Sequence, residues 1–154
     1  MKYNTEIIIN LPRARVIELF DNTENLYKWQ EGLLSFKHLE GEAGQEGSVS
    51  QMVYEGRKGD LLMKETITSR NFPDEFSAVY RAKGVHNVIN NYFTEETPGQ
   101  TTWKMFNVFR FSGLMALMSF FMKSAFEANT VLSMERFRTF AEQTEQTEQT
   151  EETN

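Results

Sequence analysis

Glu65 and Tyr54 are the residues of this sequence whose types and positions could support proton-transfer chemistry. Glu65 lies in the alternating run 61–69, where Lys64 marks the solvent face of a strand, so Glu65 is expected on the inner face. A carboxyl group in apolar surroundings has a raised pKa and can act as a general acid or base. Tyr54 has the same inward position in the run 48–55. A structural interpretation stays open, in which Glu65 pairs with a nearby Lys or Arg, or a bulge turns it outward.

The two histidines do not belong to a recognisable metal or nucleophile motif. His38 lies in a strand on the face opposite Lys37 and could reach an interior cavity, whereas His86 lies at a turn and is expected to be exposed. The sequence has no cysteine, which excludes disulfides, zinc ribbons and thiol nucleophiles. No phosphate-binding loop, nucleophile elbow or dinucleotide fingerprint is present. We therefore expect neither a metal ion nor a cofactor.

The negative charge of the chain is concentrated at its C-terminal end. The 154 residues carry a formal net charge of −6, and five glutamates lie in the segment 142–154, which has no basic residue. The rest of the chain is nearly neutral, and such a balance argues against a nucleic-acid partner. We expect a single folded domain over residues 1–141 and an acidic, solvated, low-complexity tail over residues 142–154.

The hydrophobic runs of the chain are too short for a signal peptide or a membrane span. The longest run, 114–122, is interrupted by Ser119 and falls well short of the roughly 20 residues that a spanning helix needs. It is either a buried helix segment or an interaction surface. We expect a cytoplasmic protein without a membrane span.

The hydrophobic periodicity predicts one strand, two short helices, six strands and one long helix, in that order. The long helix begins after Ser112–Gly113, and in its first half apolar residues occupy nearly every side. The predicted ranges are 3–10 for the first strand, 12–20 and 22–32 for the short helices, 33–40, 48–55, 61–69, 75–83, 87–95 and 101–111 for the following strands, and 112–141 for the long helix.

Several local segments match a known family pattern. They are Trp29–Gly32 after the second short helix, Leu39–Gly41 in the next turn region, Pro73–Phe76 before the fifth strand, and Phe111–Gly113 at the junction with the last helix. Together with the order of elements, they resemble the START-like (SRPBCC, helix-grip) superfamily. That superfamily includes birch-pollen-allergen-type proteins, START lipid-transfer domains and polyketide cyclase/dehydrase-like proteins. The resemblance covers about residues 3–141.

The resemblance implies an α+β helix-grip fold, in which a seven-stranded curved antiparallel sheet wraps around a long C-terminal helix. Two short helices lie between the first and second strands. A cavity between the sheet and the long helix would hold an apolar ligand, such as a lipid, an isoprenoid or an aromatic polyketide-like compound. The 13 phenylalanines and 8 methionines suit the lining of such a cavity.

Strand alternation and helical spacing give the candidate ligand-binding residues. In the helix, Met118, Phe121 and Ala125 follow the three- and four-residue steps of one stripe. The register of strand 87–95 stays open, since one face carries Asn91 and the other Asn90. The candidates are Met52, Tyr54, Met63, Glu65, Tyr80, Asn91, Trp103, Met105, Asn107, Met118, Phe121, Met122 and Ala125.

Three functional hypotheses follow from these observations. The first is a protein that binds a hydrophobic small molecule in an internal cavity. The second is a cyclase/dehydrase-like enzyme, with Glu65 and Tyr54 as the candidate acid or base. The third is an interaction protein that forms a homodimer through the C-terminal helix, where Leu117, Phe120 and Phe126 are surplus to one buried stripe.

Overall fold

The order of elements predicted from the sequence is confirmed. The structure is a computed structural model that describes all residues, 1–154. Its elements are β1 (Lys2–Ile9), α1 (Arg13–Asp21), the 3-10 helix η1 (Thr23–Asn25), α2 (Leu26–Trp29), β2 (Leu33–Glu40), β3 (Val49–Tyr54), β4 (Leu61–Asn71), β5 (Glu75–Ala82), β6 (Val85–Thr97), β7 (Gln100–Phe111) and α3 (Leu114–Glu152).

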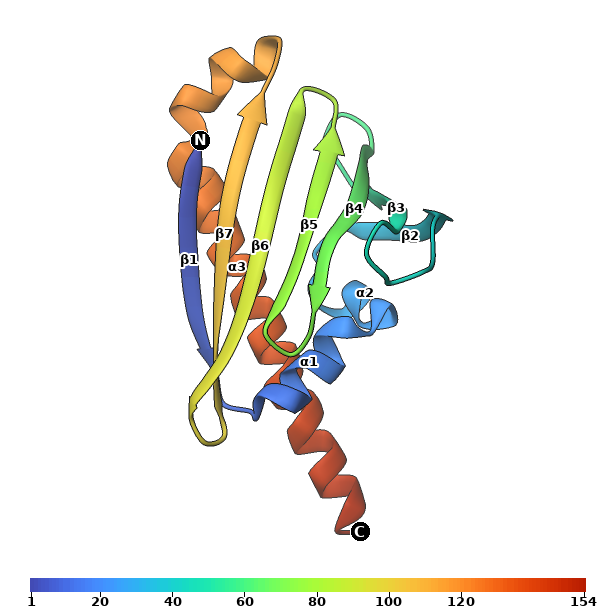
Figure 1. Ribbon diagram of the computed structural model, residues 1–154, viewed down its shortest axis with the longest axis vertical. Helices are drawn as coiled ribbons and strands as arrows, with labels where there is room; N and C mark the ends of the chain where they lie inside the picture. Colours follow the sequence, from blue (N-terminus) through green and yellow to red (C-terminus); the bar gives the residue numbers. More distant parts are fainter.

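The seven strands form one antiparallel sheet in the order β1-β7-β6-β5-β4-β3-β2. Figure 1 shows the sheet curving so that β2 and β3 turn away from the plane of β1, β7 and β6, while α3 crosses its concave side. Register shifts occur within β2 and between Ile67 and Ser69 of β4. Such bulges add twist and bend a strand. The predicted α+β class with a curved seven-stranded sheet and a long last helix is therefore confirmed.

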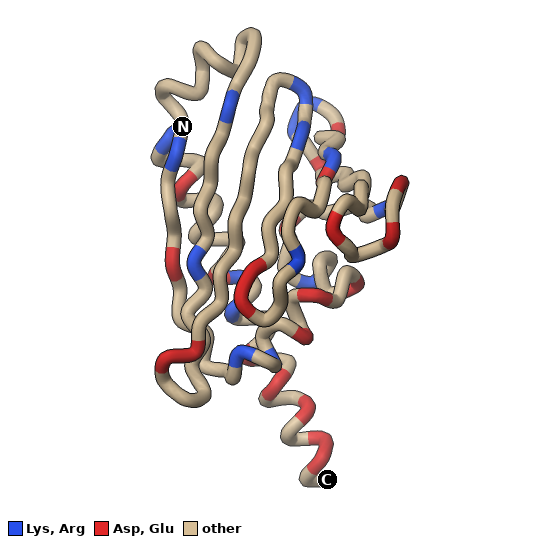
Figure 2. The backbone as a smooth tube through the Cα atoms, in the orientation of Figure 1, with Lys and Arg blue, Asp and Glu red and all other residues tan.

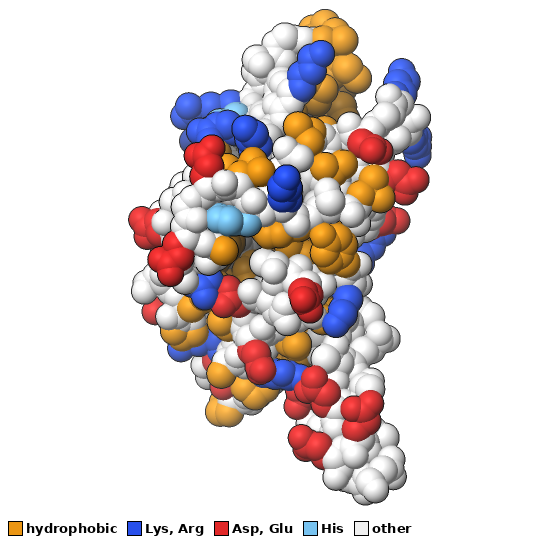
Figure 3. Space-filling model, turned by 90° about the vertical axis from the view of Figure 1, so that its right-hand side faces the viewer, with side chains coloured by type: hydrophobic (Ala, Val, Ile, Leu, Met, Phe, Trp, Pro, Cys, Tyr) orange, Lys and Arg blue, Asp and Glu red, His pale blue; other side chains and the backbone are white.

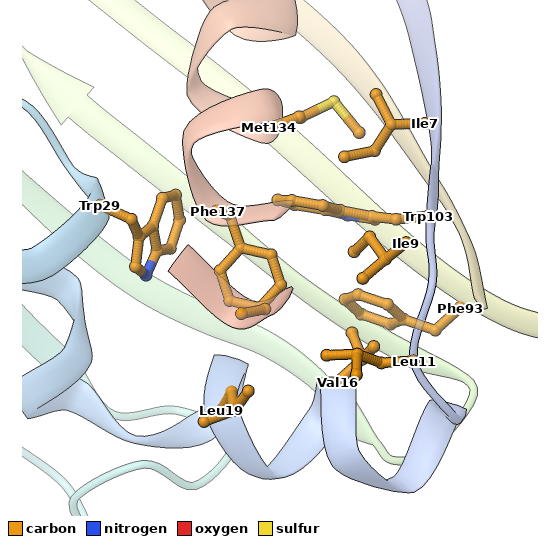
Figure 4. Close-up of a cluster of buried hydrophobic side chains, with 11 residues drawn as sticks. Ile7, Ile9, Leu11, Val16, Leu19, Trp29, Phe93, Trp103, Met134 and Phe137 are labelled. Carbon is orange, nitrogen blue, oxygen red and sulfur yellow. The ribbon is translucent and has the colours of Figure 1, made fainter. Parts of the chain in front are cut away.

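The hydrophobic core fills only one end of the space between the sheet and α3. Trp103 stacks on Phe93 with ring centroids 5.8 Å apart, and Phe137 of α3 meets Trp103 edge-on at 5.4 Å. Figure 4 shows these rings packed between β1, α1, α2 and the second half of α3. The cluster consists of Ile7, Ile9, Leu11, Val16, Leu19, Trp29, Phe93, Trp103, Met134, Phe137 and Ala141.

The predicted inner face of α3 is wrong. Met118 and Phe121 are 46% and 80% exposed, and Ala125 is exposed as well. The buried face consists instead of Met134, Phe137 and Ala141. Because the first half of the helix is apolar on nearly every side, its periodicity does not distinguish an inner from an outer face.

The acidic segment 142–154 continues α3 as far as Glu152, without a break after residue 141. The backbone N–H of Asn10 donates a hydrogen bond to Glu142 at 2.7 Å. Arg15 of α1 pairs with Glu145 at 2.7 Å and also with Glu148. The first part of the acidic segment is thus tied to the fold, and its last turns are exposed to solvent.

No helix combines the length and the hydropathy needed to cross a membrane.

Candidate ligand cavity

A cavity of about 960 Å³ lies between the concave side of the sheet and α3. Its wall includes side chains from each of the seven strands, and 20 of its 35 lining residues are hydrophobic. This volume lies at the upper end of the range typical of small-molecule sites. In the space-filling view of Figure 3, hydrophobic side chains gather in the middle of the drawn face. The cavity occupies the part of the interior that the aromatic core leaves unfilled.

Most of the strand residues singled out from the sequence line this cavity. Charged residues such as Lys64 and Lys104 are exposed on the outer face, and this fixes the inner positions of the same strands. The lining includes eight of the predicted residues, namely Tyr54, Met63, Glu65, Tyr80, Asn91, Trp103, Met105 and Asn107.

Five predicted residues are not part of the lining. Met52 is buried, with 1% of its surface exposed, and its sulfur lies 3.9 Å from the Tyr54 hydroxyl. Met118, Phe121, Met122 and Ala125 do not line the cavity because α3 presents a different face to the sheet. The residues of α3 that do line it are Met115, Phe126, Asn129, Thr130 and Ser133.

Pairing with β5 settles the register of β6 that the sequence left open. Tyr80 lies opposite Asn87, and Phe76 lies opposite Asn91. Asn87 and Asn91 therefore share the inner face. Sequence reasoning missed Asn87 and Tyr3 as lining residues, although alternation from Asn91 would have found the first of them.

A row of polar side chains crosses the inner face of the sheet from β2 to β1. Successive members lie opposite each other on neighbouring strands, except that Asn87 and Asn107 are diagonal neighbours joined by a hydrogen bond. Every member lines the cavity. In order, the members are His38, Ser50, Glu65, Tyr80, Asn87, Asn107 and Tyr3. We call this set the polar row.

Glu65 is the ionisable carboxyl of the polar row. It is 9% exposed, and the Tyr80 hydroxyl donates a hydrogen bond to its Oε2 at 2.6 Å. Burial raises the pKa of Glu65, and the bond from Tyr80 opposes this shift only in part. Glu65 takes part in no ion pair, so the expected alternative of a Lys or Arg partner is wrong.

Two tyrosines complete the surroundings of Glu65. Burial, and then the nearby charge of Glu65, raises the pKa of Tyr80 well above its ordinary value. The same two causes raise the pKa of Tyr54, whose hydroxyl donates to Gln30. Both phenols therefore stay protonated at neutral pH and can act as hydrogen-bond donors.

The asparagines of the inner face differ in whether both ends of their side-chain amides are hydrogen-bonded. Asn91 accepts from Trp103 Nε1 at 2.9 Å and donates to the Phe76 carbonyl at 3.1 Å, so both ends of its amide are satisfied. Asn87 donates to Asn107 at 3.2 Å, but Asn87 Oδ1 and Asn107 Nδ2 are buried without a partner. An unmatched acceptor and an unmatched donor thus belong to neighbouring side chains within the cavity wall.

No cluster of three or more His, Cys, Asp or Glu side chains is close enough to hold a metal ion.

Comparison with known proteins finds similar structures but no similar sequence. No protein-family model matches the chain, and no curated protein matches it in sequence. A conserved protein from Geobacillus kaustophilus superposes with a TM-score of 0.78 at 12% identity, covering 93% of this chain and 96% of that one. The ZhuI aromatase/cyclase from Streptomyces sp. R1128 gives 0.73 at 12% identity, covering 92% and 93%. Ara h 8.0201 gives 0.70 at 13% identity, covering 92% and 97%.

These identities are low enough that the likeness concerns the fold alone. The element order, the curved sheet and the position of the last helix agree with it. The chain therefore has the helix-grip fold.

Proposed function

We propose that this protein binds a hydrophobic small molecule of the lipid, isoprenoid or aromatic polyketide type inside the cavity. The observation that carries the proposal is the cavity of about 960 Å³ with a mainly hydrophobic wall. An apolar cavity of this size costs stability when empty, because its lining side chains lack contacts on one side. A bound apolar molecule would restore those contacts.

The polar row narrows the class of ligand. Glu65 with Tyr80 and Asn87 with Asn107 are two polar pairs, separated by two strand spacings, or about 10 Å. Apolar side chains lie on both sides of the row: Ile67, Phe76 and Ile89 toward the aromatic core, and Met63, Ala82 and Val85 toward the start of α3. We infer a ligand that is apolar at its ends and carries hydroxyl or carbonyl oxygens near its middle.

Dye binding tests occupancy of the cavity. The protein is expected to bind anilinonaphthalene sulfonate, and an extracted or added hydrophobic ligand is expected to displace the dye. Ile89→Trp adds bulk inside the cavity and should weaken dye binding by at least about tenfold. Val88→Trp, on the opposite face of the same strand, is the matched control. If both variants bind the dye as the unaltered protein does, and native mass spectrometry finds no ligand, the proposal fails.

Glu65 supports a second candidate function, that of a cyclase/dehydrase-like enzyme. A buried carboxyl whose pKa is raised, with a tyrosine donor and no cation, suits general acid–base catalysis. The carboxylate would take a proton from a carbon next to a carbonyl, and the carboxylic acid would return it to the oxygen that leaves as water.

The enzyme hypothesis is tested with a synthetic β-hydroxy ketone whose dehydration to the conjugated enone is followed by ultraviolet absorption. Glu65→Gln is expected to lower turnover by at least about a hundredfold while dye affinity changes little, because the amide keeps the size of the carboxyl but does not transfer protons. Glu40→Gln, at an exposed carboxyl of β2, is the matched control. Equal turnover by the Glu65→Gln variant and the unaltered protein would remove Glu65 from the chemistry, and no turnover by the unaltered protein would leave the binding function alone.

A further inference from the structure

The first turns of α3 carry large apolar side chains that are mostly exposed to solvent. Leu114 and Leu117 are 74% and 70% exposed, and Phe120 and Phe121 are 84% and 80% exposed. Met118 between them is 46% exposed. We call these five residues the apolar apex. An exposed apolar patch of this kind usually marks an interaction surface.

The apolar apex is held in place by the turn between β5 and β6. Ser112 N–H donates to the Gly84 carbonyl at 3.0 Å. Met115 packs directly over Gly84, where a Cβ would meet the Met115 side chain at 3.2 Å. Met115 therefore fixes the inner side of the first turn, and the neighbouring apolar residues are left on the outside.

Basic side chains without ion-pair partners lie at the same end of the sheet as the apolar apex. The starts of β1 and β6 and the ends of β3, β5 and β7 meet at this end of the antiparallel sheet. In Figure 2, lysines and arginines mark several of these strand ends, whereas the last turns of α3 at the opposite end of the molecule carry acidic residues. The basic residues of this end are Lys2, Arg57, Lys58, Arg81, Lys83, Arg110 and Lys123, and its acidic residues are Glu55, Asp60 and Glu127.

We propose that this end of the molecule docks onto the surface of an anionic lipid bilayer. The apolar apex would lie at the boundary between headgroups and acyl chains, and the surrounding lysines and arginines would contact anionic headgroups. The acidic C-terminal turns of α3 point away from such a surface (Figure 1).

Charge favours a bilayer over a second copy of the chain. A twofold dimer through the apolar apex would place the same basic end of both copies face to face, and like charges across an interface oppose association. An anionic bilayer supplies both an apolar layer for Phe120 and Phe121 and charges of opposite sign.

Docking at this end also has a consequence for the cavity. Met115 and Lys83 lie at the same end of the sheet as the apolar apex, and both also line the cavity. A docked molecule would hold that part of the cavity wall against the bilayer, where hydrophobic molecules dissolve. The docking itself does not depend on the proposed ligand.

Co-sedimentation with vesicles tests the proposal. The full chain is expected to bind phosphatidylcholine vesicles containing roughly a third of phosphatidylserine, to bind pure phosphatidylcholine much more weakly, and to lose affinity as salt is added. The double variant Phe120→Ser, Phe121→Ser should weaken binding by at least about tenfold, and so should Lys83→Glu combined with Lys123→Glu. Leu132→Ser, at an exposed residue further along the same helix, is the matched control.

The outcomes distinguish a lipid bilayer from a second copy of the chain as the partner of the apolar apex. Thermal unfolding of each variant checks that the fold is kept, which is expected because the changed side chains are exposed. Equal sedimentation with both vesicle types, or unchanged binding by the Phe120/Phe121 double variant, would overturn the proposal. So would a stable dimer in analytical ultracentrifugation that the double variant dissociates, because a second copy would then cover the apolar apex.

Discussion

Glu65 is a carboxyl buried in a mainly apolar wall, with a tyrosine hydroxyl as its hydrogen-bond donor and no cation beside it. Such a group favours its neutral form in the folded protein more than in the unfolded chain, because burial penalises its charge. In the interval between the ordinary pKa of glutamate and the raised pKa of Glu65, the folded protein therefore holds more protons than the unfolded chain. The free energy of unfolding must fall as the pH rises through that interval.

Glu65→Gln should remove this loss of stability, since the amide stays neutral at every pH. The free energy of unfolding of the variant relative to the unaltered protein is expected to rise as the pH increases above the ordinary glutamate range. At lower pH, where Glu65 is neutral in both states, the two proteins should be close. Urea unfolding at a series of pH values measures the difference. Two parallel curves would show that burial of Glu65 is not coupled to folding.

Asn91 illustrates a polar residue of the cavity wall with a structural role. It links the Trp103 indole N–H to the Phe76 carbonyl, and it is only 4% exposed. Asn91→Ala should lower the free energy of unfolding by about 1–3 kcal/mol, because a buried donor and a buried acceptor lose their partner. Asn4→Ala, at an exposed position of β1, should change it by less than about 0.5 kcal/mol. Equal effects of both substitutions in urea unfolding would contradict this role.

At the scale of elements, the two halves of α3 have different surroundings. Its second half presents Met134, Phe137 and Ala141 to the aromatic core, whereas its first half lines the cavity with a few residues and exposes the rest. The acidic end then extends past the sheet and is tied to α1 only through Arg15. Packing energy is therefore concentrated in the middle of the helix.

Two phenylalanines of α3 should consequently differ greatly in their contribution to stability. Phe137 is fully buried, and Phe137→Ala is expected to cost about 3–5 kcal/mol. Phe120→Ala should cost less than about 0.5 kcal/mol, because Phe120 is 84% exposed. Chemical denaturation measures both values. A cost above about 2 kcal/mol for Phe120→Ala would show that the first turns are packed in solution.

Truncation tests the contribution of the acidic end. A chain that ends after Ala141 loses Glu142, Glu145 and Glu148, the partners of Asn10 and Arg15, and should be less stable by about 1 kcal/mol. A chain that ends after Thr150 keeps these contacts and should be unchanged within about 0.5 kcal/mol. Thermal unfolding compares the three lengths. The loss should shrink at high salt, which screens the exposed ion pairs, and a loss independent of salt would contradict an electrostatic origin.

At the scale of the whole molecule, a packed aromatic core and an open cavity share the interior between one sheet and one helix. Figure 4 shows how the core closes the end of the interior between α1, α2 and the second half of α3. The remaining volume is lined by the polar row and by apolar side chains on either side of it. The apolar and polar groups of this wall can therefore form favourable contacts with a ligand.

Ligand binding should therefore raise the stability of the whole fold. The compound that displaces the dye most tightly, present at about a hundredfold excess over its dissociation constant, should raise the free energy of unfolding by about 2.7 kcal/mol. Calorimetry with and without the compound measures the effect, and Ile89→Trp should reduce it. An effect of equal size in Ile89→Trp would place the binding site outside the cavity.

The sequence alone determined which side chains of most strands face inward. Met63, Glu65 and Tyr80 could be assigned because side chains in a strand alternate with a period of two, and charged neighbours such as Lys64 and Arg81 identify the solvent face. The order of elements could be predicted for the same reason, since changes of periodicity mark where strands give way to helices.

The tertiary structure alone decided the faces of β6 and α3. Both faces of β6 carry asparagine, so only pairing with β5 places Asn87 and Asn91 inside. The first half of α3 is apolar on nearly all sides, and contact with Gly84 selects Met115 rather than Met118 for the interior. A periodic pattern assigns a face only where polar and apolar residues alternate with the period of the element, and elsewhere the neighbouring elements must choose it.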